Sequence, residues 1–212
     1  MKKQKSNNSP ISSNESYKTI AFPTVEVLFK EKNSKFFGYC FPVSREIDVK
    51  IALELVKKQH QTAKHFCYAY QIGTEQLQHR ANDDGEPNNS AGLPIFGQIQ
   101  SFGLTEILIV VVRYFGGTKL GVGGLISAYK TTAKLGLETA EIIEKNIKIE
   151  YEINFEYSNL SLIMRILKEK KWQIVSQSTN LSCKIIIAIG KNEASLLIEI
   201  FEPFFEIQLK KL

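Results

Sequence analysis

Hydrophobic and polar residues follow two different rhythms along this chain, and these rhythms predict strands and helices. Strict alternation over Ala63–Ile72 predicts a strand whose two faces carry different side chains. The segment Glu106–Val112 is almost entirely apolar, which predicts a strand that is buried on both faces. Apolar residues at helical spacing predict helices over Asp48–His60 and Leu125–Ile143. The intervening segment Gly73–Pro94 is polar and is predicted to be a long loop.

The first predicted helix has an apolar face that should meet the core. Its members share one side of the helix: Ile47, Ile51, Leu55 and Val56. Asp48 suits the first turn, where a carboxylate meets the positive end of the helix dipole. His60 ends the helix among polar residues, so its side chain is predicted to be solvated.

The last third of the chain changes character and predicts a separate domain. A strand over Ile147–Tyr157 is followed by a helix, two strands, a second helix and a final strand. This βαββαβ order is that of a ferredoxin-like split-βαβ domain. The expected fold class is therefore α+β, with two α/β-sandwich domains over residues 17–144 and 145–212. Residues 1–16 form a polar tail that is predicted to be disordered.

Composition places the chain among globular proteins, but its net charge is concentrated in the tail. The chain has 212 residues, of which 43% are hydrophobic and 23% charged, and its net charge is +5. Residues 1–20 hold four lysines and one glutamate, so +3 of the excess lies there. Residues 21–143 and 144–212 each carry only +1. Binding to a polyanion would therefore need a local basic patch.

Three features of the sequence predict a cytoplasmic protein that makes no use of a membrane. The longest aliphatic run, Ile107–Val112, has six residues, whereas a membrane helix needs about 20. Met1–Asn14 lacks the apolar core of a secretory signal. The three cysteines, Cys40, Cys67 and Cys183, are odd in number and far apart. They suggest reduced, buried thiols and neither a disulfide framework nor a metal knuckle.

The polar segment 80–94 carries unusually dense negative charge. Three carboxylates fall within four residues: Asp83, Asp84 and Glu86. Like charges so close need solvent, cationic partners or a metal ion. The spacing fails the EF-hand pattern, and a turn rich in Asp, Asn, Gly and Pro is the plainer alternative. Neutralisation by Arg80 and Arg113 is favoured over a divalent cation, so no metal site is predicted.

A glycine-rich turn joins the buried strand to the second helix. A strand, a glycine loop and a helix N-terminus together form a common anion site, because free amides and the helix dipole point at the ligand. The candidate anion-binding residues are Arg113, Lys119, Gly116, Gly117, Gly121, Gly123 and Gly124. Neither the Walker A nor the GxGxxG spacing is present. Glycines that permit tight packing of strand and helix are the alternative.

His65 and Cys67 lie two residues apart on a predicted strand and therefore share a face. Such a pair could form a Cys–His dyad or part of a metal site. A half-buried histidine beside an inert thiol is the simpler interpretation. His65 and the three carboxylates, Asp83, Asp84 and Glu86, are therefore the weak candidates for a catalytic role.

Taken together, these segments resemble the IMPACT family, in particular its bacterial two-domain, YigZ-type members. The resemblance is carried by His65–Tyr70, Asn82–Pro87, Ala91–Ile95, Val110–Leu125 and Ala128-Tyr129. It implies an N-terminal domain with the fold of ribosomal protein S5 domain 2. It also implies a C-terminal domain similar to a late domain of elongation factor G. Eukaryotic members of the family are linked to translational control through partner proteins, and no catalytic reaction follows from the resemblance.

Two classes of function, and one purely structural interpretation, fit these observations. The leading hypothesis is a non-enzymatic binding protein of translation or its regulation, which contacts RNA or a ribosome-associated partner through the glycine-rich loop. The alternative is an enzyme or sensor for a small phosphorylated ligand, with Asp83, Asp84 or Glu86 as general base or Mg²⁺ ligand. In the structural interpretation the carboxylates pair directly with Arg113 and Lys119. The sequence indicates no cofactor and does not determine the oligomeric state.

Overall fold

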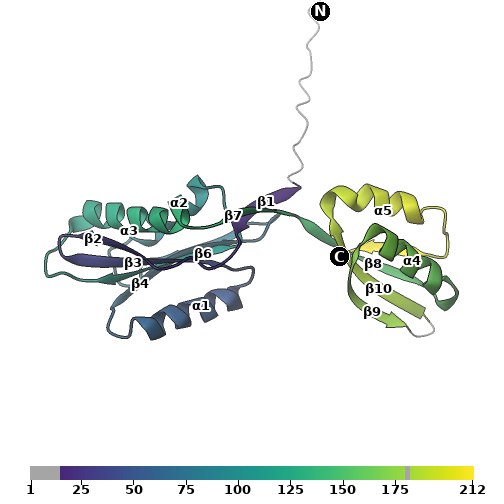
Figure 1. Cartoon of the computed structure of the whole chain (residues 1–212), viewed down its shortest axis with the longest axis horizontal. Coiled ribbons are helices and arrows are strands. Elements are labelled where there is room, and N and C mark those ends of the chain that lie inside the picture. Colours follow the sequence, from purple (N-terminus) through teal and green to yellow (C-terminus); the bar gives the residue numbers. More distant parts are fainter. Residues whose placement is uncertain (1–14, 180–181) are drawn as a thin grey trace, which may run out of the picture. The chain divides into compact units, whose positions relative to one another are not determined.

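The computed structural model describes residues 15–179 and 182–212. These residues form two compact units, which we describe separately (Figure 1). The larger unit is Tyr17–Lys145, and the smaller contains Asn146–Leu212. The tail predicted over residues 1–16 lies outside the described residues apart from Glu15 and Ser16. Among the described helices, none combines the length and apolar character needed to cross a lipid bilayer.

A five-stranded antiparallel sheet forms the centre of the larger unit. Its strands lie in the order β2-β3-β6-β4-β5. Two further strands, β1 and β7, pair with each other outside this sheet. The strands are β1 (Ser16–Ile20), β2 (Val27–Glu31), β3 (Ser34–Pro42), β4 (His65–Ile72), β5 (Gln78–Asn82), β6 (Ile107–Tyr114) and β7 (Ile142–Asn146).

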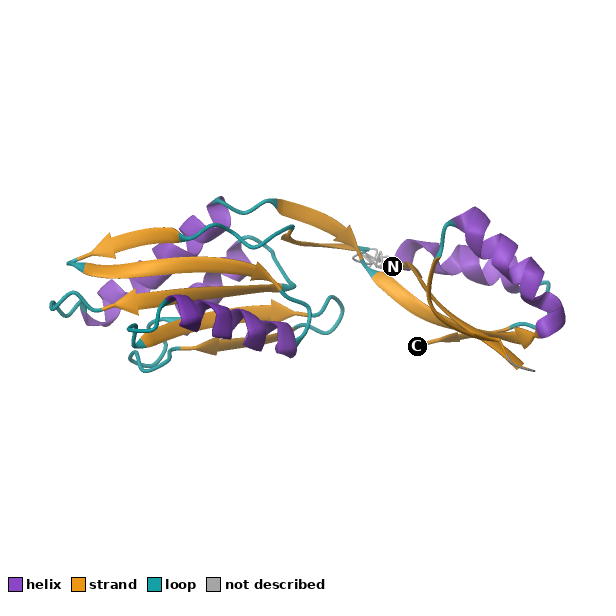
Figure 2. Ribbon diagram, turned by 60° about the horizontal axis from the view of Figure 1, so that its bottom comes forward, coloured by secondary structure: helices purple, strands orange, loops and turns teal. Residues whose placement is uncertain are grey.

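Helices cover both faces of this sheet, as Figures 1 and 2 show. Helix α1 (Glu46–Gln59) lies on one face, and α2 (Gly92–Ser101) and α3 (Gly121–Glu138) lie on the other. Alternate residues of β6 face opposite ways, and six are fully buried: Ile107, Ile109 and Val111 towards α2 and α3, and Leu108, Val110 and Val112 towards α1. The prediction of a strand buried on both faces is confirmed. Each such side chain contributes roughly 1.5–3 kcal/mol relative to exposure.

The long loop predicted over Gly73–Pro94 is partly wrong, because it contains β5. This strand is an edge strand that pairs with β4 through the backbone, from Tyr68 opposite Asn82 to Ile72 opposite Gln78. Its residues are mostly exposed. Since backbone pairing does not need an apolar face at an edge, the hydrophobic pattern carries no signal for it.

The bounds of the helix predicted over Leu125–Ile143 also need correction. Helix α3 begins at Gly121, so the glycine-rich segment itself supplies the first turn. The helix ends at Glu138, and Ile142 and Ile143 belong to β7, which pairs with β1. These apolar residues extend the helical pattern in the sequence, whereas in the fold they pair with a strand from the start of the chain.

The apolar face predicted for α1 is right at Val56 and wrong at the other three positions. The buried residues are Val49, Ala52 and Val56, and they pack on β6 and its neighbours. In contrast, three predicted core residues are half exposed: Ile47 at 50%, Ile51 at 58% and Leu55 at 52%. The sequence carries two apolar stripes at helical spacing, and the stripe with Val49, Ala52 and Val56 is the one that packs on the sheet, with Leu53 partly buried beside it.

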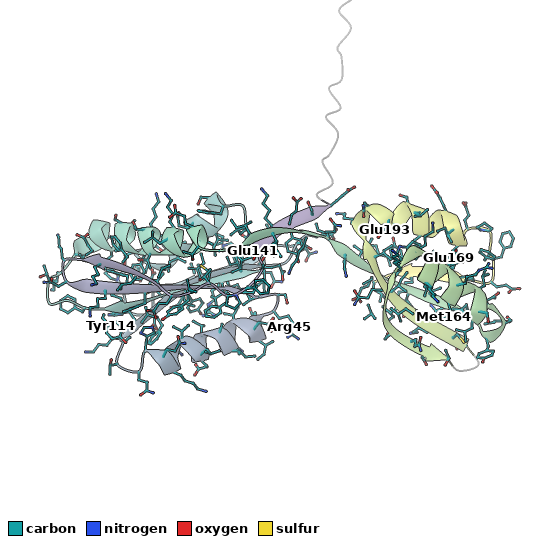
Figure 3. The ribbon with its side chains drawn as sticks, in the orientation of Figure 1. Arg45, Tyr114, Glu141, Met164, Glu169 and Glu193 are labelled. Carbon is teal, nitrogen blue, oxygen red and sulfur yellow. The ribbon has the colours of Figure 1, made fainter. Side chains whose placement is uncertain are left out.

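The prediction of a solvated His60 is wrong, because the structure buries this side chain beneath the end of α1. Its Nε2 lies 2.6 Å from the hydroxyl of Tyr39, and its Nδ1 lies 3.1 Å from the hydroxyl of Tyr114, which is labelled in Figure 3. Tyr39 in turn donates a hydrogen bond to the carboxylate of Glu26. Burial lowers the pKa of His60, although the nearby Glu26 opposes this shift.

The smaller unit is a four-stranded antiparallel sheet with two helices on one face. The order βαββαβ is as predicted, and the strands lie in the order β11-β8-β10-β9. Trp172 is buried in its core and donates from Nε1 to the carboxylate of Glu193, which is labelled in Figure 3, at 3.0 Å. The elements are β8 (Lys148–Glu156), η1 (Tyr157–Asn159), α4 (Leu160–Lys170), β9 (Gln173–Thr179), β10 (Ser182–Gly190), η2 (Lys191–Glu193), α5 (Ala194–Phe201) and β11 (Gln208–Lys211).

The state of His60 predicts how stability depends on pH. Because its pKa is lowered in the folded protein, the unfolded chain takes up the proton first as the pH falls. The free energy of unfolding should therefore decrease as the pH drops below about 6.5, the ordinary value for histidine. Urea unfolding of the full chain between about pH 7.5 and pH 5.5 measures this loss. The variant His60→Gln should lose part of the pH dependence, and an unchanged dependence in this variant would contradict the assignment.

Candidate functional site

The acidic segment and the glycine-rich segment meet at one end of the larger unit's sheet. Strand β6 ends there and β4 begins there, with His65 opposite Arg113. We call residues 83–91 the acidic loop and residues 115–124 the glycine loop. The acidic loop follows β5 and leads into α2, and the glycine loop follows β6 and leads into α3. Both helices therefore begin at this end of the sheet.

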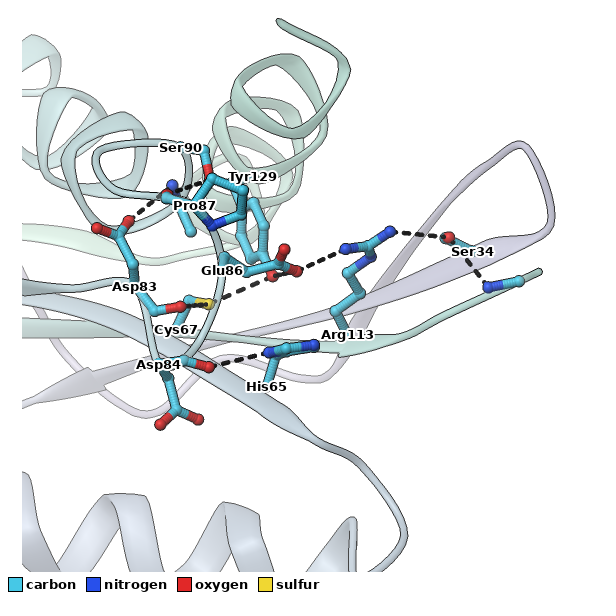
Figure 4. A network of polar contacts seen from close by, with 12 residues as sticks. Ser34, His65, Cys67, Asp83, Asp84, Glu86, Pro87, Ser90, Arg113 and Tyr129 are labelled. Carbon is cyan, nitrogen blue, oxygen red and sulfur yellow. Dashed lines mark hydrogen bonds and ion pairs between the residues drawn. The ribbon is translucent and has the colours of Figure 1, made fainter. Parts of the chain in front are cut away.

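A buried ion pair joins the two segments (Figure 4). Arg113 Nη1 lies 2.7 Å from Glu86 Oε1, and the two side chains are only 7% and 4% exposed. The same Oε1 accepts a hydrogen bond from the Tyr129 hydroxyl at 2.8 Å. Breaking a buried pair by removing one partner leaves an uncompensated charge, so these groups depend on one another.

The rest of the Arg113 side chain contacts the glycine loop and β3. Nη2 lies 3.5 Å from the hydroxyl of Ser34, and that hydroxyl accepts a 3.2 Å hydrogen bond from the Gly116 amide. The guanidinium carbon lies 5.6 Å from the ring centres of both Phe36 and Phe115. Among the described residues, the Nε of Arg113 has no hydrogen-bond partner. Arg113 thus connects the acidic loop, the glycine loop and β3.

Asp83 acts as the cap of α2 although it lies eight residues before the capping position. Its carboxylate accepts hydrogen bonds from the backbone amides of Asn89, Ala91 and Gly92 at 2.8–2.9 Å. These amides would otherwise lack partners at the helix start. The negative charge of Asp83 is therefore used inside the fold.

Asp84 holds the start of β4 and orients His65. Its carboxylate accepts a 2.6 Å hydrogen bond from the Phe66 amide, and its backbone adopts a positive φ of 40°. Its carbonyl oxygen lies 2.9 Å from Nδ1 of His65. Since a carbonyl only accepts, Nδ1 of His65 carries the proton, and Nε2 is the ring nitrogen left for other partners.

The neutralisation of the acidic loop differs in part from the prediction. Arg113 pairs with Glu86 as expected, but Arg80 does not take part: in residues 15–179 and 182–212, the Arg113–Glu86 pair is the one ion pair that the loop makes. Backbone amides stabilise Asp83 and Asp84 instead. The same part of the chain holds no group of three or more potential metal-ligating side chains.

His65 and Cys67 both face the acidic loop, and they do not bond to each other. The Cys67 thiol donates to the Asp83 carbonyl at 2.9 Å and lies 3.3 Å from the Tyr129 hydroxyl. Burial raises the pKa of this thiol, which disfavours the nucleophilic thiolate. All three cysteines are within the described residues and are buried, as predicted.

The glycines of the glycine loop serve different purposes. A Cβ on Gly116 would lie 2.1 Å from the backbone of Asn33, so tight packing explains this position. Gly117 and Gly121 adopt positive φ values of 87° and 72°. Gly123 has neither property: its φ is ordinary, and nothing lies within 4 Å of a Cβ placed there.

Beside the glycine loop, α3 begins without a side-chain cap. The capping position is Leu120, and the first turn holds no acidic residue. Lys119 is exposed next to it. Residues Thr62 to His65 and Arg113 to Phe115 line a pocket of about 410 Å³ at the same end of the sheet.

Comparison with known proteins identifies the family. Residues 32–137 match the family described as the Impact N-terminal domain. An IMPACT family member from Haemophilus influenzae is 34% identical over 176 residues, which are 80% of this chain and 84% of that protein. This chain belongs to the IMPACT family. IMPACT family member YigZ from Escherichia coli is 34% identical over 154 residues, 72% of this chain and 76% of that protein.

One solved structure is similar to this chain over nearly its whole length. It is described as the crystal structure of a hypothetical protein and matches with a TM-score of 0.76 at 29% sequence identity. The match covers 93% of this chain and 98% of that one. The family match and the two relatives confirm the resemblance to the IMPACT family inferred from the sequence.

The matched IMPACT segment contains the whole polar network of Figure 4, including two residues that sequence reasoning did not select. Ser34 lies in no conspicuous motif, and Tyr129 lies at an apolar position of a helix. Only the appearance of Tyr129 in the family-like segment Ala128-Tyr129 singled it out. Their partners, Arg113 and Glu86, are far away in sequence, so spacing could not reveal the contacts.

The buried ion pair predicts a non-additive pattern of stability. Arg113→Met should lower the free energy of unfolding by about 3–5 kcal/mol, because Glu86 stays buried without its partner. The double variant Arg113→Met with Glu86→Gln should recover part of this loss. Urea unfolding of the full chain measures both. If the single and the double variant lose the same free energy of unfolding, the unpaired charge on Glu86 is not the cause of the loss in Arg113→Met.

The role of Asp83 predicts a separate and smaller effect. Asp83→Ala should cost about 1–2 kcal/mol, the usual range for a lost helix cap. Mg²⁺ or EDTA should not move the wild-type thermal midpoint, because backbone amides and Arg113 already satisfy these carboxylates. A rise in midpoint with Mg²⁺ that disappears in Asp83→Ala would mean that a cation binds there instead.

Proposed function

We propose that this IMPACT family chain is a non-catalytic binding protein of translation or its regulation. In this proposal it contacts RNA or a ribosome-associated partner through the glycine loop and the first turn of α3. One observation carries the proposal: an 18-residue helix begins among exposed glycines beside Lys119, with no side-chain cap and no carboxylate in its first turn. The start of such a helix carries partial positive charge and attracts anions such as phosphate.

Gly123 supports this interpretation because the fold does not require it. A glycine inside a helix costs about 0.5–1 kcal/mol relative to alanine. Neither positive φ nor a close neighbour compensates for that cost at Gly123. An exposed glycine that is costly and structurally unnecessary is expected where a partner's surface approaches the backbone closely.

The architecture gives weaker support through analogy. The strand order of the smaller unit and its two helices on one face agree with the ferredoxin-like assignment. For the larger unit, the proposed relationship is to ribosomal protein S5 domain 2. Both folds recur in the translation apparatus, which favours a role there, although a fold alone does not specify function.

The alternative of an enzyme for a small phosphorylated ligand is less favoured by the site. It would use Asp83, Asp84 or Glu86 as general base or Mg²⁺ ligand. Asp83 and Glu86 accept several short hydrogen bonds within the fold. Groups held in this way stabilise loops and are poorly placed to accept a substrate proton.

The proposal predicts opposite effects of one substitution on stability and on binding. Gly123→Ala should stabilise the chain by about 0.5–1 kcal/mol and weaken its association with ribosomal fractions or RNA. Gly97→Ala is the matched control, because Gly97 is also helical and nothing lies within 4 Å of a Cβ placed on it. It should stabilise to a similar extent without affecting association.

The measurement is co-sedimentation of the full chain with ribosomes and recovery of crosslinked RNA from the native host. Lys119→Glu should also reduce recovery, because it places a negative charge beside the start of α3. The proposal is wrong if the protein neither co-sediments with ribosomes nor crosslinks to RNA. It is also wrong if Gly123→Ala and Lys119→Glu are recovered as well as wild type in both measurements.

A further inference from the structure

The pocket beside the glycine loop has a composition that points to a ligand. Its volume of about 410 Å³ lies within the ~300–1,000 Å³ typical of small-ligand sites. Three of its seven lining residues are basic: Lys64, His65 and Arg113. None of the seven is acidic, although the larger unit as a whole is almost neutral. Because Glu86 pairs with Arg113, the positive charge that this pocket offers a ligand comes from the exposed Lys64.

An aromatic ring stands at the edge of this basic pocket. Phe115 is 57% exposed, so one face of its ring is open to a ligand. The guanidinium carbon of Arg113 lies 5.6 Å from the centre of the ring. Arg113 is itself fixed by Glu86 and by the neighbouring ring of Phe36, so it limits the positions that Phe115 can take.

His65 contributes a nitrogen with a defined role. The bond from Nδ1 to the Asp84 carbonyl fixes the ring, and a Cβ on Gly85 would lie only 3.5 Å from the same nitrogen. The acidic loop therefore packs against His65 and orients its ring. Nε2 is left as the ring nitrogen available to a ligand, next to the exposed ammonium group of Lys64.

We propose that this pocket binds a nucleoside phosphate unit, with the base stacked on Phe115, the phosphate held by Lys64, and Nε2 of His65 left to accept a hydrogen bond from a hydroxyl or amino group of the ligand. An exposed aromatic ring beside cations is the usual means of binding single-stranded nucleic acid, because every base offers a face for stacking. A phosphate group on a peptide would use the cations but leave the exposed ring without a purpose. The inference rests on the proposed function and deepens it by naming nucleotides as the ligand class.

The test uses the full chain and a fluorescein-labelled single-stranded RNA octamer, followed by fluorescence anisotropy. Phe115→Ala should weaken binding about tenfold, the range expected for one lost stacking contact. Phe115→Trp should retain binding, and Phe22→Ala is the control because Phe22 is another exposed aromatic of the same unit, at 68%. Lys64→Ala should weaken binding and reduce the slope of log K against log salt by about 0.7. Lys50→Ala, at an exposed lysine of α1, should change neither.

Competition distinguishes the source of the nucleotide. Adenosine 5′-monophosphate should displace the octamer from wild type, and inorganic phosphate and O-phosphoserine should do so far less well. A further outcome is that the mononucleotide displaces the octamer while the octamer binds no more tightly than the mononucleotide. This result would support the pocket and indicate that its ligand is a free nucleotide. Equal displacement by O-phosphoserine, or no binding of either nucleotide probe, would overturn the inference.

The inference and the proposed function can fail separately. If ribosome association depends on Gly123 but the octamer binds equally to wild type and Phe115→Ala, the pocket assignment is wrong and the proposed function stands. If Phe115→Ala abolishes mononucleotide binding while no ribosomal association exists, the pocket assignment stands and the proposed function is wrong.

Discussion

The buried pair of Arg113 and Glu86 connects the acidic loop to the glycine loop, to β3 and to α3. Both charges are almost completely removed from water, so each must be satisfied by the other and by neighbouring hydrogen bonds. Tyr129 donates to Glu86 from α3, and Ser34 links Arg113 to the amide of Gly116. A change at any of these residues is therefore felt in both loops. Residues that lie far apart in the sequence therefore form a single polar network.

Helices α2 and α3 both begin at the same end of the sheet, but their first backbone amides have different surroundings. At α2, Asp83 returns from the preceding loop and satisfies three backbone amides. At α3, the start is formed by exposed glycines next to Lys119, and no side chain caps it. The first arrangement stabilises the fold, whereas the second leaves positive potential on the surface. The carboxylates of the acidic loop thus hold the fold together through hydrogen bonds and the ion pair, whereas Lys119 and Lys64 are exposed.

The smaller unit shows a contrasting surface. On the sheet face opposite the helices, Lys184 pairs with Glu152 at 3.0 Å, and Lys210 lies opposite Glu152 on the neighbouring strand. Charges of both signs alternate there, so this face has little attraction for a polyanion. Our proposals therefore place phosphate recognition in the larger unit, at the pocket and the glycine loop. A local excess of positive charge, and not the net charge of +5, is the relevant quantity.

The sequence by itself determined the features that depend on local pattern: the buried strand β6, the βαββαβ order of the last third, the buried thiols and the family. It could not place His60 or the apolar face of α1, because both depend on which side the helix turns to the sheet. Nor could it show β5, whose partner is the backbone of β4. The contacts of Glu86 with Arg113 and Tyr129 span 27 and 43 residues. Only the tertiary structure decides such pairs. A buried charge must be neutralised by a group that lies close to it in space, and the distance along the chain does not reveal which group that is.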